Sequence, residues 1–334
     1  MLAIVLVALA GLRFARLDAD PSPLLASDHL TDEGWWAHNA RNHALFGRWI
    51  LDEHNPPLYG APLWTAALRG SYAAFGVGLW QTRFVSALAG LATCALVYAF
   101  VRRSAGRNAA LLATLVFGLD PFALAYHRSG FVEPFMVAWL TACLLALDAA
   151  AKRPALAALA GALFAGAVLA KVWAAGALVG PLGYWTIRLA QESGAARRIL
   201  REAALFAAGG GAIAGVVLGW LVIPNLGDVV DGLLVHSHRA KPANPLHALG
   251  LLGLSTATGR LVGTDAFVQA SSYQVLLLAL LLARAFIARA RWVMDRSSLL
   301  CVAWIASGLV QVTWQIYQPD RRWLVLGPAL AMLL

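Results

Sequence analysis

The chain has 334 residues, of which 60% are hydrophobic and only 13% are charged. Soluble domains carry about 25% charged residues, so this chain has too few to cover a soluble surface. The composition therefore excludes a soluble globular enzyme and predicts a polytopic helical membrane protein.

Apolar stretches long enough to cross a bilayer recur from one end of the chain to the other. A transmembrane helix needs about 20 predominantly apolar residues. We therefore predict an all-α fold with about ten transmembrane helices in a single domain, residues 1–334. The predicted spans lie near residues 1–17, 77–101, 108–126, 134–150, 154–172, 174–188, 203–223, 273–290, 298–317 and 323–334.

Both ends of the chain are apolar. The first stretch lacks the basic start and the cleavage site of a signal peptide, so it is predicted to be a transmembrane helix. Since residues 1–12 and 323–334 are apolar up to the termini, we expect the native chain to extend beyond both ends.

Basic residues cluster beside alternate short connections. Thirteen Lys and Arg residues, with only four acidic ones, lie near 102–107, 148–153, 188–202 and 284–296, so this side carries the whole net charge of +9. The positive-inside rule makes that side cytoplasmic. Because the excess charge reflects topology, we predict no nucleic-acid partner.

The opposite, outer side has two long loops, residues 18–76 and 224–272. Connections this long are uncommon unless they carry function. We therefore expect interfacial helices and the functional site in these loops. The predicted location is the bacterial inner (plasma) membrane, with the site on its periplasmic or extracellular side.

The first outer loop contains an acidic pair, Asp32 and Glu33. Trp36, Ala40 and His43 follow at helical spacing, which predicts an amphipathic helix in the membrane interface. The pair would lie in its first turn, where the helix dipole favours ionised carboxylates that can act as a general base. Alternatively, the acidic residues only stabilise the start of the helix.

A polar segment follows this predicted helix. Pro56 and Pro57 interrupt helical structure and favour an extended chain. The segment is either an ordinary solvated loop or a place where His54, Asn55 and Tyr59 contact a substrate.

Charged residues recur at the outer ends of later spans. Glu133 precedes Pro134 at a predicted helix start. Lys171 either snorkels to the interface or is functional, because ionisable groups at membrane depth usually have a role. Arg321 and Arg322 contradict the charge rule for the outer side, which an anionic partner would explain.

Carboxylates and cations together suit the displacement of a phosphate-linked leaving group. The carboxylates are Asp32, Glu33 and Glu133, and the cations are Arg128, Lys171, Arg321 and Arg322. A carboxylate takes the proton from an attacking hydroxyl, and the cations neutralise the departing phosphate. A phosphate is a weak base, so no general acid is needed.

Several motifs, in their order and spacing, support this interpretation. They are Leu17-Asp18, Asp32-Glu33, Pro56-Pro57-Leu58-Tyr59, Trp80-Gln81-Thr82-Arg83-Phe84, Arg128 with Glu133, Lys171, and Arg321-Arg322-Trp323. In these features the chain resembles the membrane glycosyltransferases of the C-type fold. The nearest in pattern are the bacterial aminoarabinose transferases of lipid A and the protein O-mannosyltransferases (families 83 and 39).

The resemblance implies that Asp32, with Glu33 beside it, is the catalytic base of an inverting transfer. It implies a polyprenyl-phosphate-linked sugar donor and an acceptor on the outer side, which is a lipid, a protein or a glycan. The donor-phosphate candidates are Lys171, Arg128, Arg321 and Arg322. The substrate-binding candidates are His54, Asn55, Tyr59 and Glu133. The chain departs from the aminoarabinose transferases at Gly34-Trp35-Trp36, where they have an arginine, and at Asn55, where they have a lysine.

Two alternatives remain open. His236 and His238, with Asp228, Asp231 and His247 nearby, offer metal ligands in the second outer loop, but we predict no metal and no other cofactor. The rival function is a transporter or flippase for a lipid-linked or anionic solute. A transporter is expected to show two repeated halves and ionisable residues near the middle of the bilayer. Asp120 is the main residue that favours this function.

Overall fold

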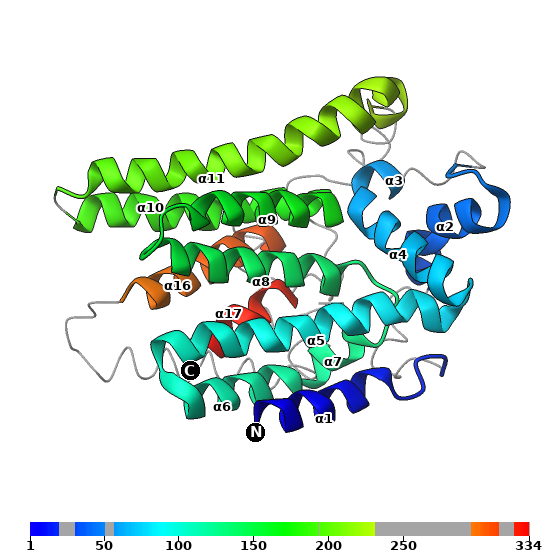
Figure 1. The fold of residues 1–334 in the computed structure, drawn as a ribbon, viewed down its shortest axis with the longest axis horizontal. Helices are drawn as coiled ribbons and strands as arrows, with labels where there is room; N and C mark the ends of the chain where they lie inside the picture. Colours follow the sequence, from blue (N-terminus) through cyan, green and yellow to red (C-terminus); the bar gives the residue numbers. More distant parts are fainter. Residues whose placement is uncertain (20–30, 51–56, 193, 231–294, 314–323, 334) are drawn as a thin grey trace, which may run out of the picture.

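The computed structural model describes residues 1–19, 31–50, 57–192, 194–230, 295–313 and 324–333. All regular structure within these ranges is helical, as predicted. The long helices lie side by side in a bundle, and α2, α3 and α4 gather at one end of it (Figure 1).

Three helices are long and apolar enough to cross a membrane. They are α5 (Leu79–Ser104), α8 (Glu133–Ala150) and the continuous segment Ala196–Val230, which begins with α11 (Ala196–Val217). The bent pair of α6 (Gly106–Gly118) and α7 (Pro121–His127) makes a fourth if it forms one span. The shorter helices of the bundle are α1 (Leu2–Phe14), α9 (Leu156–Ala170), η2 (Val172–Leu178), α10 (Val179–Gln191), η3 (Leu218–Val222), η4 (Ile223–Asn225), α16 (Arg296–Thr313) and α17 (Gly327–Met332). The count of ten spans stays a prediction, and the span near 273–290 lies outside the described residues.

The predicted span 108–126 is broken in the middle. Helices α6 and α7 meet at 66°, and Asp120 caps α7 by accepting a hydrogen bond from the Ala123 N–H (3.2 Å). Pro121 follows in the first turn, where its missing N–H costs nothing. Asp120, the residue that most favoured a transporter, therefore has a role as a helix cap.

Close backbone contact joins α9 and α11. A Cβ atom on Gly161 would lie 1.9 Å from the Phe206 carbonyl oxygen, and one on Gly209 would lie 1.9 Å from that of Ala158. Small residues allow such an approach between helices in lipid. These glycines therefore set the distance between the two helices.

Ion pairs, of which Arg188 and Glu202 are buried, join α10, α11 and α16 at the end of the bundle away from α2 (Figure 1). Arg188 donates to Glu202 (Nη1–Oε2, 3.0 Å) and to Glu192 (Nε–Oε1, 2.9 Å), and Arg296 also donates to Glu192 (2.8 Å). The sequence assigns these four residues to the cytoplasmic side.

The described parts of residues 18–76, predicted as the first outer loop, contain helices, and Pro57 begins one of them where an extended chain was predicted. Helix α2 (Thr31–Phe46) has Asp32 and Glu33 in its first turn, as expected. The short α3 (Pro57–Gly60) and the 14-residue α4 (Pro62–Phe75) follow it. Trp36 and Ala40, from the predicted apolar stripe of α2, are buried in the protein, and Trp64 of α4 donates to the Trp36 carbonyl (3.2 Å).

Candidate active site

The start of α2 is held by Glu33. Arg83, in the first turns of α5, donates to both carboxylate oxygens (Nε–Oε1, 3.2 Å; Nη2–Oε2, 2.9 Å), and the Gly130 N–H donates to Oε1 (2.6 Å). The two side chains are only 4% and 8% exposed. A bidentate arginine–carboxylate pair is strong and geometrically specific. Glu33 therefore anchors the helix.

Arg83 extends this anchor to the segment after α1. Its Nη1 donates to the carbonyl oxygens of Leu17 (2.8 Å) and Ala19 (2.5 Å). Arg83 belongs to the Trp80–Phe84 motif, whose pattern alone assigns it no role. One signal in the sequence pointed to a role for Arg83. It lies in the first turns of an apolar span, at the end of that span where basic residues are not in excess.

Asp32 is the other member of the acidic pair, and its side chain is partly exposed. It lies four residues before Trp36, and residues at this spacing are neighbours on a helix surface, with Cβ atoms about 5–6 Å apart. The two carboxylates therefore have different surroundings. Glu33 is paired with Arg83, whereas Asp32 is partly exposed at the start of α2.

Lys171 follows α9 and reaches the same tryptophan. Its Nζ lies 2.5 Å from the Oε1 atom of Glu133, the first residue of α8, and 4.8 Å from the centroid of the Trp36 ring. The Lys171 side chain is 9% exposed and that of Glu133 is fully buried. The fold thus brings a predicted phosphate-binding cation to a tryptophan of α2, the helix that has Asp32 in its first turn.

Arg128 has a different position among the predicted cations. Its Nη1 donates to the Leu12 carbonyl (2.6 Å) and its Nη2 to the Arg16 carbonyl (3.4 Å), so the guanidinium lies against the end of α1. The structure shows no contact between Arg128 and Lys171. Its role toward the donor phosphate stays a prediction.

Tyr59 links α3 to the end of the segment Ala196–Val230. Its hydroxyl donates to the Asp228 carboxylate (3.2 Å). Burial and the negative charge of Asp228 raise the pKa of Tyr59. Four other candidates, His54, Asn55, Arg321 and Arg322, lie outside the described residues.

The candidate metal ligands His236, His238 and His247, with Asp231, also lie outside the described residues. Within the described ranges, no three His, Cys, Asp or Glu side chains come together as a metal site would require.

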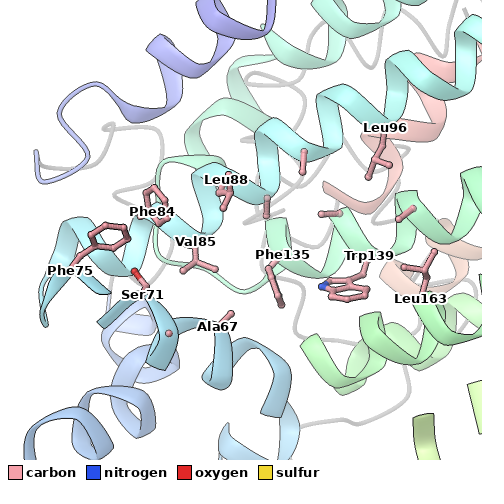
Figure 2. Close-up of a pocket in the computed structure, with 15 residues that line it drawn as sticks. Ala67, Ser71, Phe75, Phe84, Val85, Leu88, Leu96, Phe135, Trp139 and Leu163 are labelled. Atoms are coloured by element: carbon pink, nitrogen blue, oxygen red, sulfur yellow. The ribbon is translucent and has the colours of Figure 1, made fainter. Parts of the chain in front are cut away.

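An apolar groove of about 580 Å³ runs along α5 and α8 and beneath α4 (Figure 2). Apart from Ser71, whose hydroxyl donates to the Gln81 carbonyl (2.8 Å), its lining residues are aliphatic, aromatic or glycine. Phe84, which follows Arg83, and Phe135, two residues after Glu133, lie in its lining. The buried Trp64 contacts Phe135 (ring centroids 5.8 Å apart) on one side and the Trp36 backbone on the other.

Residues 56–221 match the family model of dolichyl-phosphate-mannose-protein mannosyltransferase. The matched segment contains Tyr59, Arg83, Arg128, Glu133 and Lys171. No curated protein matches the chain.

Two solved structures have a similar fold. ArnT from Cupriavidus metallidurans, bound to undecaprenyl phosphate, has a TM-score of 0.68 and 18% identity, over 99% of this chain and 59% of that one. The archaeal oligosaccharyltransferase AglB from Archaeoglobus fulgidus, in complex with an inhibitory peptide and a dolichol-phosphate, has a TM-score of 0.61 and 14% identity, over 99% of this chain and 49% of that one. The chain thus spans between about half and three fifths of their length. The resemblance predicted from the sequence is therefore confirmed, and the chain has the C-type fold of the membrane glycosyltransferases.

Proposed function

We propose that this chain is the transmembrane catalytic unit of an inverting glycosyltransferase. It moves a sugar from a polyprenyl-phosphate-linked donor to a lipid, protein or glycan acceptor on the outer face of the bacterial inner membrane. The observation that carries the proposal is the contact between Lys171 and Trp36, a residue of the helix that has Asp32 in its first turn. The matched mannosyltransferase family and the undecaprenyl phosphate bound to ArnT support a lipid-phosphate donor.

The reaction is a single displacement at the anomeric carbon. The Asp32 carboxylate takes the proton of the acceptor hydroxyl while the hydroxyl oxygen bonds to the sugar. The bond from the sugar to the phosphate oxygen breaks, and its electron pair leaves with the phosphate, which Lys171 neutralises. Attack opposite the leaving group inverts the anomeric configuration. Glu33 is not the base, because Arg83 and the Gly130 N–H already occupy both of its oxygens.

The apolar groove supports a substrate that carries a hydrocarbon chain. Its volume of about 580 Å³ falls in the range of ligand-binding clefts. It follows α5 and α8, two helices that are long and apolar enough to cross a membrane. At that depth a lipid chain is the available apolar occupant.

The test is a transfer assay with purified protein in lipid vesicles. The protein is incubated with a panel of polyprenyl-phosphate sugars, labelled in the sugar, and a cell-envelope extract as the source of acceptor. We expect one donor to lose its sugar to the extract and the product to show the inverted anomeric configuration. Movement of an intact labelled donor across the vesicle membrane without sugar transfer would instead establish the transporter.

A further inference from the structure

The positive charge of Lys171 already has a counter-ion within the protein. Its ammonium is 2.5 Å from the Glu133 carboxylate, and the face of Trp36 covers it at 4.8 Å. Water has little access, since the lysine side chain is 9% exposed and the glutamate side chain is fully buried. The three groups come from α2, α8 and the residue after α9, so tertiary packing brings them together.

The pairing of Lys171 with Glu133 weakens the attraction of the site for an anion. A lysine and a glutamate in contact have no net charge, so the pair attracts a phosphate far less than a lone lysine would. Breaking a buried pair by removing one partner leaves an uncompensated charge, which is strongly unfavourable. An incoming phosphate can become the new partner of the ammonium, but the displaced Glu133 carboxylate then bears this cost, so the pair opposes donor binding.

We propose that Glu133 is a positioning residue, the counter-ion of Lys171 in the absence of donor, and that the donor phosphate takes its place at Nζ. Trp36 is the second positioning residue. Its ring holds the ammonium through a cation–π contact while the anionic partner changes. This inference rests on the proposed function and gives Glu133 a role different from the substrate contact expected from the sequence.

The two roles predict opposite effects of the same substitution. If Glu133 competes with the donor phosphate, Glu133→Gln removes the competing charge and tightens binding. If Glu133 contacts the substrate, Glu133→Gln weakens binding. The probe is undecaprenyl phosphate, titrated into the full chain in lipid nanodiscs and followed by its dissociation constant. We expect Glu133→Gln to bind about tenfold more tightly than wild type, a change of about 1.4 kcal/mol.

Two further variants connect the effect to Lys171 and Trp36. The double variant Glu133→Gln/Lys171→Met should show no gain over Lys171→Met alone, because the gain requires the ammonium. Trp36→Phe keeps an aromatic face and should bind nearly as wild type does, whereas Trp36→Leu should bind several-fold more weakly. Rescue by phenylalanine distinguishes a cation–π contact from simple packing. Trp304→Leu is the control for the loss of a buried indole, because Trp304 of α16 is only 3% exposed.

Glu202→Gln is the matched control for the loss of a buried ion pair. Glu202 is equally buried and pairs with Arg188 at the other end of the bundle, so its variant should leave the affinity for undecaprenyl phosphate unchanged. If Glu133→Gln does not fold, Glu133→Asp replaces it, since the shorter carboxylate should give a smaller gain of the same sign.

Equal or weaker binding by a folded Glu133 variant overturns this inference and leaves the proposed donor standing. Failure of both wild type and variant to bind undecaprenyl phosphate overturns the donor class as well.

Discussion

Adjacent carboxylates with different partners have different chemical roles in this protein. Glu33 is enclosed by Arg83 and the Gly130 N–H, so it stabilises the start of α2. Asp32 lies in the same first turn of α2, one turn before Trp36, whose ring contacts the Lys171 ammonium. We therefore propose Asp32 as the base, because both oxygens of Glu33 already accept hydrogen bonds.

Asp32→Asn should reduce sugar transfer by about 10²–10⁴-fold, the range that a positioned general base contributes. The variant should keep its fold and its affinity for undecaprenyl phosphate, because the amide has the size of the carboxylate. Transfer rates from labelled donor and a binding titration measure the two effects. Asp148→Asn, at the opposite end of the bundle, serves as the control. A normal transfer rate for Asp32→Asn would show that another group is the base.

Helix pairs in this bundle depend on contacts that one side chain can disrupt. Helices α9 and α11 approach until backbone atoms of one touch glycines of the other. At the far end, α10, α11 and α16 share the Arg188 ion pairs. The contact between α9 and α11 depends on the small size of glycine, and the junction of α10, α11 and α16 depends on charge. Each is therefore tested by a different substitution.

Gly161→Val should lower the thermal stability of the protein, because its Cβ would overlap the Phe206 carbonyl of α11. Overpacking of this kind costs about 1–3 kcal/mol. Gly211→Val is the control, since a Cβ there meets nothing within 4 Å. Melting temperatures of both variants in the same detergent test the prediction. Equal melting temperatures would show that the α9–α11 distance adjusts freely.

Glu192 should make the stability of the α10–α11–α16 junction depend on pH. Hydrogen bonds from Arg188, and then from Arg296, lower the pKa of this carboxyl group. The pKa of an unfolded glutamate is about 4.3. Because the pKa of Glu192 is lower in the folded state, its charge stabilises the fold at pH values above about 4.3. This stabilisation is lost as the pH falls through the folded pKa. The melting temperature of wild type should exceed that of Glu192→Gln at pH 7, and the difference should shrink below about pH 4. A difference independent of pH would contradict this account.

The whole molecule has two chemically distinct ends. One end holds α2 and α4, and Trp36 of α2 contacts Lys171 there. The other holds the basic connections and the Arg188 ion pairs. In a membrane this asymmetry predicts that the candidate active site faces outward.

Labelling of single cysteines tests the orientation. The three native cysteines are buried, so an impermeant maleimide should react with an introduced thiol only. Arg48→Cys, at an exposed position beyond α2, should be labelled in intact cells. Arg107→Cys, at an exposed position near the start of α6, should be labelled only after permeabilisation. The reverse result would place the site in the cytoplasm.

The amino-acid sequence by itself determined the helical membrane class and the local signals of this protein, and it predicts the orientation. Hydropathy and charge are properties of consecutive residues, so the apolar spans, the basic side, the acidic first turn of α2 and the start of α8 before Pro134 were all predictable. Only the tertiary structure decided which charges meet. Glu33 and Arg83 are 50 residues apart in the sequence, and Glu133 and Lys171 are 38 apart. Their pairing depends on how α2, α5, α8 and α9 pack against one another, and no local pattern contains that information.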